Sequence, residues 1–158
     1  MKVLRGSKGQ TAMEYLMTYG WAILIILVVG GVLYYYGVFS PSTLVGESKT
    51  GFSKIDVVDW QWRASDDHLL IMLENRAGVD VNVTSIVVTY GTTTSTYTIP
   101  GGESISAGDR SSFIDATTTG IDFDSGDAYQ IDVTINYYRT DSPATTLSSS
   151  GRLSGKAA

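Results

Sequence analysis

The sequence predicts an α+β protein, in which one long N-terminal helix is followed by a domain built only of β-strands. Residues 10–41 are mostly apolar, and no charged residue lies between Glu14 and Glu47. After residue 51 the pattern changes to short segments in which apolar and polar residues alternate. This alternation has the period of a half-buried strand.

The N-terminal segment has the length and the flanks of a membrane-spanning helix. Residues 21–39 are nearly all apolar or aromatic, and about 20 such residues cross the hydrocarbon core of a bilayer. The basic residues Lys2, Arg5 and Lys8 precede this run, and all 16 Asp and Glu residues follow them. The positive-inside bias therefore predicts an N-terminus in the cytoplasm and a C-terminal domain outside.

Two simple interpretations of this segment are a secretory signal peptide and an uncleaved anchor. A secretory signal has an apolar core of about 7–15 residues followed by a small-x-small cleavage site, and residues 37–41 make a poor site of that kind. An uncleaved anchor accounts for the length and the flanks of the run. It does not account for Glu14, because a carboxylate at a membrane edge is costly unless it has a partner.

A short motif leads directly into the apolar run: a basic residue, Gly, Gln, and a Glu at the fifth position counted from that Gln. It reads Lys8-Gly9-Gln10-Thr11-Ala12-Met13-Glu14. This motif resembles the class III signal peptide of archaeal type IV pilin-like proteins. The resemblance covers the N-terminal segment and does not extend into the β-rich part of the chain.

The resemblance implies that a membrane-embedded prepilin peptidase cuts the chain between Gly9 and Gln10, on the cytoplasmic side. Residues 1–9 would be a basic leader that is removed, and residues 10–41 a transmembrane helix that later drives polymerisation. It further implies that Glu14 faces the freed α-amino group of a neighbouring subunit and sets the axial register. An opposite charge within about 4–6 Å keeps both groups ionised in a dry setting.

Residues 42–51 are expected to form a linker, and residues 52–158 a head domain. Its clearest strand is predicted over 127–138, where apolar residues occupy every second position. About seven short strands with turn signals between them indicate a β-sandwich of immunoglobulin-like architecture. The further strands are expected at 53–62, 67–74, 79–90, 95–99, 111–115 and 145–149.

Three local features refine this expectation. The alternation changes phase at Thr84 and Ser85, which predicts a β-bulge or a strand that changes partner sheets. The Pro-Gly-Gly sequence at 100–102 predicts a turn. Trp60 and Trp62 share one face of their strand and are expected in the core, because large aromatic residues usually fill sandwiches.

The composition argues against several classes of function. The net charge is −5, and an acidic body is a poor candidate for nucleic-acid binding, which needs clustered basic side chains. There is no cysteine, and His68 is the single histidine. Since no nucleophile elbow, zinc motif or phosphate loop is present, neither an enzyme nor a cofactor is expected.

Two weaker site candidates lie in the head domain. Asp122, Asp124 and Asp127 have the spacing of a calcium loop, but they lack the full motif, so an acidic hairpin turn is the favoured interpretation. Asn82 begins the sequon Asn82-Val83-Thr84, a candidate for N-glycosylation in an external domain.

The sequence therefore predicts a structural subunit of an archaeal type IV pilus-like filament that serves adhesion or surface attachment. Its partners would be the prepilin peptidase, other pilin subunits and, before assembly, the cytoplasmic membrane. The precursor would lie in that membrane and the product in an extracellular filament. The alternative is a membrane-anchored extracellular binding module, or a minor pilin that forms no filament itself.

Overall fold

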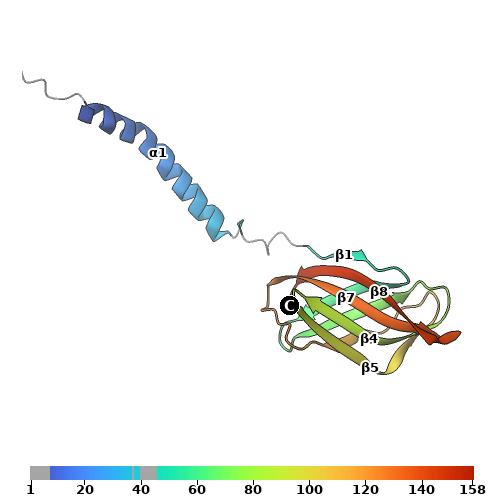
Figure 1. Ribbon diagram of the computed structural model, residues 1–158. Helices are drawn as coiled ribbons and strands as arrows, with labels where there is room; N and C mark the ends of the chain where they lie inside the picture. Colours follow the sequence, from blue (N-terminus) through green and yellow to red (C-terminus); the bar gives the residue numbers. More distant parts are fainter. Residues whose placement is uncertain (1–7, 37, 40–45) are drawn as a thin grey trace, which may run out of the picture. The chain divides into compact units, whose positions relative to one another are not determined.

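The computed structural model describes residues 8–36, 38–39 and 46–158 and divides the chain into two units, Met1–Thr43 and Leu44–Ala158 (Figure 1). The first unit contains the single helix of the described residues, and the second contains two antiparallel sheets. The predicted order of an N-terminal apolar helix and a β-sandwich head is thus confirmed.

Helix α1 (Lys8–Tyr35) is continuous over 28 residues. The amide of Val38 donates to the carbonyl of Leu33 at 3.0 Å, which is the 6→1 hydrogen bond of a Schellman motif. Gly37, between these two residues, lies outside the described residues. The predicted helix end at residue 41 is therefore wrong, because this C-cap ends the helix at Tyr35, well before Pro41.

The described part of the head domain, residues 46–158, has eight strands. The larger sheet has the strand order β1-β8-β7-β4-β5 and the smaller one β2-β3-β6, and Figure 1 shows strands of the larger sheet side by side. All pairings are antiparallel. The strands are β1 (Ser48–Gly51), β2 (Ile55–Arg63), β3 (His68–Asn75), β4 (Val81–Tyr90), β5 (Thr93–Ile105), β6 (Ile114–Thr117), β7 (Ala128–Arg139) and β8 (Ser142–Lys156).

The core of the head domain lies between the two sheets, and its residues come from the alternating positions of the strands. Trp62 is fully buried, with its ring centroid 4.9 Å from that of Phe123 and 6.0 Å from that of Tyr129. Burial raises the pKa of Tyr129 to about 12, so its phenol is neutral at physiological pH. Trp60 is buried as well, which confirms the core placement predicted for both tryptophans.

The phase slip in β4 is a bulge, as the sequence predicts. Against β7, Val83 and Ser85 pair with the adjacent residues Tyr137 and Asn136, so Thr84 is the extra residue. Against β5 they pair with Glu103 and Thr98, so there the extra residues lie on β5.

The turn predicted at residues 100–102 does not end the strand, because β5 spans Thr93–Ile105. Residues 99–102 instead bulge out of the pairing with β4, and both Gly101 and Gly102 have positive φ. Since β5 is an edge strand, it accommodates a proline and a two-glycine kink without losing interior ladder hydrogen bonds.

The predicted linker at 42–51 is corrected in its second part, because Ser48–Gly51 forms β1 and pairs with β8. Its first part lies largely outside the described residues. Gly51 has a φ of +89° at the close approach of β1 to β8. A Cβ placed there would stand 2.7 Å from the Cα of Gly151, so both the backbone angle and the available space favour glycine.

Gly51→Ala is expected to destabilise the head domain more than Gly126→Ala. Both glycines have nearly the same φ, +89° and +90°, but a Cβ at Gly126 would meet nothing within 4 Å. Gly126→Ala therefore reports the cost of the backbone angle alone, about 1–2 kcal/mol, and Gly51→Ala adds a clash with backbone atoms. Urea unfolding of the two variants measures the difference, and equal losses would contradict the close approach.

Candidate functional site

Helix α1 is apolar around its whole circumference. The segment Ala12–Tyr35 is long and apolar enough to cross a membrane, as judged by length and composition, and none of it is buried inside the protein. A helix that is hydrophobic on all sides is normally covered by lipid or by other helices. The chain therefore has an N-terminal helix with the properties of a membrane anchor or a signal.

Glu14 is the one charged residue of α1 that follows Lys8. It is exposed, and its backbone carbonyl accepts a hydrogen bond of 2.9 Å from the Thr18 hydroxyl. Among the residues that the structure describes, the carboxylate of Glu14 contacts no cation. The chain thus presents a carboxyl group on an otherwise apolar helix, with no cation supplied by its own described residues.

The predicted cleavage junction, Gly9 and Gln10, lies in the first turn of α1, which begins at Lys8. Lys2 and Arg5 lie outside the described residues. The first turn of a helix has few intrahelical hydrogen bonds and frays readily. A peptidase that acts at this junction would therefore need to unwind only the end of the helix.

Three glycines of α1 leave room for another helix. A Cβ at Gly20, Gly30 or Gly31 would meet nothing within 4 Å. Gly20 and Gly31 are separated by just over three turns, so they lie on the same side of the helix. Small residues on one side let helix backbones approach closely in the absence of water.

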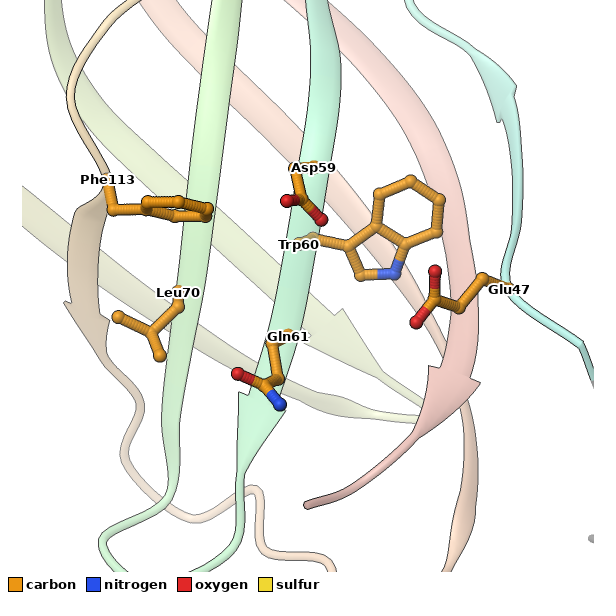
Figure 2. A pocket seen from close by; sticks show the side chains of 6 residues that line it. All are labelled: Glu47, Asp59, Trp60, Gln61, Leu70 and Phe113. Carbon is orange, nitrogen blue, oxygen red and sulfur yellow. The ribbon is translucent and has the colours of Figure 1, made fainter.

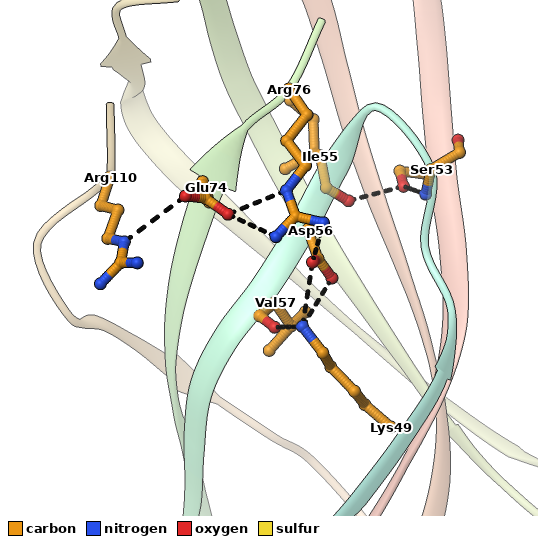
Figure 3. A network of polar contacts seen from close by, with 9 residues as sticks. Lys49, Ser53, Ile55, Asp56, Val57, Glu74, Arg76 and Arg110 are labelled. Atoms are coloured by element: carbon orange, nitrogen blue, oxygen red, sulfur yellow. Dashed lines mark hydrogen bonds and ion pairs between the residues drawn. The ribbon is translucent and has the colours of Figure 1, made fainter. Parts of the chain in front are cut away.

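An ion network joins the two sheets around Asp56, whose side chain is only 10 % exposed (Figure 3). The ammonium group of Lys49 lies 2.9 Å from both carboxylate oxygens and also donates to the carbonyl of Val57. The guanidinium group of Arg76 lies 2.8 Å from Asp56 and 2.7 Å from Glu74. Because Lys49 belongs to β1 and Asp56 to β2, the network links the first strand of the head domain to the opposite sheet.

Glu74→Gln is expected to weaken the dependence of stability on acid pH. The hydrogen bond from Arg76 holds the pKa of Glu74 below its usual value of 4.5. This carboxylate therefore contributes stability above about pH 4.5, and the contribution is lost as the pH falls through the lowered pKa. The slope of the unfolding free energy between pH 5 and pH 3 measures the effect. Arg76→Gln should show the same reduced slope, and an unchanged slope in Glu74→Gln would contradict the assignment.

Asp122, Asp124 and Asp127, the calcium candidates, lie with Asp67 around a polar hollow of about 270 Å³. The amide of Asp127 donates to the carbonyl of Asp124 at 2.9 Å, and a carboxylate oxygen of Asp127 accepts from the amide of Asp124 at 3.3 Å. These contacts are those of a tight turn. No group of three or more His, Cys, Asp or Glu within the described ranges is arranged to hold a metal ion, and calcium binding stays a prediction.

Asn82, the sequon residue, lies on β4 between β5 and β7. Its side-chain amide donates to the hydroxyl of Ser104 at 3.2 Å, and its side-chain oxygen is buried against Gly102. A glycan at Asn82 would replace the bond to Ser104 and needs the side chain to turn outward. N-glycosylation of Asn82 stays a prediction.

His68, the first residue of β3, lies in a charged cluster. Its Nδ1 atom is 2.6 Å from a carboxylate oxygen of Asp115, and Arg63 lies 2.9 Å from the other oxygen of Asp115 and 2.7 Å from Asp66. The hydrogen bond from Arg63 holds the pKa of Asp66 below its usual value. These contacts fit a surface ion cluster that joins β2, β3 and β6.

One further feature was not predicted from the sequence, a hollow of about 430 Å³ beside β2 (Figure 2). Figure 2 shows Phe113 and Leu70 on one side, Trp60 and Glu47 on the other, and Asp59 and Gln61 between them. The outward positions of β2 provide Asp59 and Gln61, and an outward position of β3 provides Leu70. The hollow is lined by Glu47, Asp59, Trp60, Gln61, Leu70 and Phe113.

No protein-family model matches the chain, and no curated protein matches it either.

Proposed function

We propose that this protein is a structural subunit of an archaeal type IV pilus-like surface filament, cut before Gln10 and assembled through α1. The β-sandwich would be displayed on the filament surface and would serve adhesion or attachment. In this proposal the chain has no catalytic role. Its partners are a prepilin peptidase, which removes residues 1–9, and further copies of the same chain.

The observation that carries the proposal is a helix that is apolar on every side except for Glu14. Such a helix is stable in a membrane and equally stable in a bundle of identical helices, because both environments exclude water. A plain anchor needs no carboxylate on its apolar surface, whereas a bundle gains from a group that fixes the axial position of each helix. Glu14 fits that role when it faces the α-amino group of Gln10 in a neighbouring subunit.

The open glycine positions support the same assembly. Gly20 and Gly31 lie on one side of α1, and helices that meet at such positions gain dispersion contacts. While the subunit is in the membrane, Glu14 near the cytoplasmic end of the helix can reach the interfacial water. The carboxylate is thus tolerated before assembly and paired after it.

Co-expression of the full chain with an archaeal prepilin peptidase tests the processing step. Intact-mass measurement is expected to show loss of residues 1–9, with Gln10 as the new N-terminus. A Gly9→Val variant, which blocks the approach of the peptidase to the junction, should keep the full mass. If the chain keeps its full mass with an active peptidase, an uncleaved anchor that carries a binding domain accounts for it better.

A further inference from the structure

Phe113 is one of two large hydrophobic side chains of the head domain that are strongly exposed within the part the structure describes. It is 49 % exposed, and the other, Tyr90, is 47 % exposed. Tyr90 stacks edge to face on Phe123, whereas Phe113 borders the hollow beside β2, next to the half-buried Leu70. An exposed aromatic ring beside a hollow provides an apolar contact surface for a ligand.

The polar side chains of the hollow are free to form hydrogen bonds with a ligand. Glu47, Asp59 and Gln61 make no side-chain hydrogen bond or ion pair with any other residue in the described ranges. This distinguishes Asp59 from the carboxylates of Asp56 and Asp132, which are paired with Lys or Arg. An ionised carboxylate only accepts hydrogen bonds, and an amide both donates and accepts.

We propose that this hollow binds a neutral pyranose sugar of a surface glycan. The apolar face of the sugar ring would lie against Phe113 and Leu70. Its neighbouring hydroxyls would donate to Asp59 and Glu47, in charge-assisted hydrogen bonds that are stronger than neutral ones. Gln61 would both donate to and accept from the same hydroxyls.

The size of the hollow suits this ligand. A volume of about 430 Å³ lies within the range of small-molecule sites, roughly 300–1,000 Å³. A sugar bound here would be the adhesion target of the proposed filament. Only this biological role rests on the proposed function; the binding itself does not. A cationic group is the competing ligand, because two carboxylates face the hollow, and the experiment must separate it from a neutral sugar.

The test uses the full chain in detergent and a printed array of neutral, amino-bearing and acidic glycans. Retention on neutral glycans is expected, followed by titration of the full chain with the best of them. Phe113→Ala and Asp59→Asn should each weaken that affinity about tenfold or more, as expected for loss of a stacking surface or a charge-assisted hydrogen bond. Tyr90→Ala is the matched control, because Tyr90 is equally exposed but lies outside the hollow, and it should leave the affinity unchanged.

Three results would overturn the sugar site. They are no retention on any neutral glycan, retention on amino-bearing glycans alone, and equal losses in Phe113→Ala and Tyr90→Ala. Unfolding curves of the three variants exclude misfolding as the cause of a loss. The filament proposal is judged separately by the N-terminus of the mature protein, so a cut subunit without sugar binding refutes this inference alone. An uncut chain that binds sugar refutes only the filament proposal.

Discussion

Glu14→Ala is expected to abolish surface filaments while leaving the subunit in the membrane. In the proposed bundle, the variant leaves the α-amino group of Gln10 buried without a counter-charge. Breaking a buried ion pair in this way costs about 3–5 kcal/mol, which lowers the equilibrium constant of each addition step by roughly a hundredfold or more. Electron microscopy of cells and the amount of sheared surface protein measure the loss.

Two further variants separate charge from shape at Glu14. Glu14→Gln keeps the size of the side chain and removes the charge, so it should fail to assemble like Glu14→Ala. Thr18→Ala removes the hydroxyl that bonds the carbonyl of Glu14, together with a methyl group, but keeps the carboxylate, and it should assemble normally. Abundant filaments built from cut Glu14→Ala subunits would show that the carboxylate does not set the register.

Trp62→Ala is expected to cause the largest loss of stability in the head domain. The indole is fully buried between the two sheets and packs against Phe123 and Tyr129. Its removal loses the transfer free energy of the ring and leaves a cavity, which together cost about 3–5 kcal/mol. For a domain of this size the melting temperature should fall by roughly 10–20 °C, measured by near-ultraviolet circular dichroism of the full chain.

Phe113→Ala provides the control for that loss. It removes a similar aromatic side chain from a position that is 49 % exposed, so the change in unfolding free energy should stay within about 0.5 kcal/mol. If Trp62→Ala melts within about 2 °C of Phe113→Ala, the core is not centred on the Trp62 cluster.

The strands that the sequence predicts well are those with one apolar and one polar face. In β7, Ile131, Val133 and Ile135 are buried and the residues between them are not, because the strand pairs on both sides and covers the core. The bulge in β4 was predictable for the same reason, since an extra residue must change the phase of an alternating pattern.

Parts of β5 and β8 were missed because their residues also occur in loops: Pro100, Gly101 and Gly102 of β5 were interpreted as a turn, and β8 is rich in Ser and Gly after residue 149. In the missed parts, Ser104 of β5 and Ser150 of β8 are exposed, and glycines at 101, 102, 151 and 155 interrupt the alternation. Strand β1 was missed because all of its residues are exposed, so it has no alternation to detect. Its place depends on pairing with β8, far away in the sequence.

The candidate sites also differ in how far the sequence alone predicts them. Gly9, Gln10 and Glu14 form a motif in one short segment, so the sequence alone was enough to propose it. The hollow beside β2 brings together Glu47, Asp59 and Phe113, which are far apart in the chain. The pairing of β2 with β3, and of β3 with β6, brings Asp59 and Phe113 together. Glu47 comes from the other sheet, because it directly precedes β1, which pairs with β8.

The central claim is that the chain is cut and then polymerises through its helix. The most direct test is to determine the N-terminal residue of the protein in sheared surface filaments and in native membranes, by intact-mass and peptide mass spectrometry. The account predicts Gln10 as the first residue of the filament material. A chain that begins at Met1 and occurs only in membranes would contradict it and would leave a membrane-anchored binding domain.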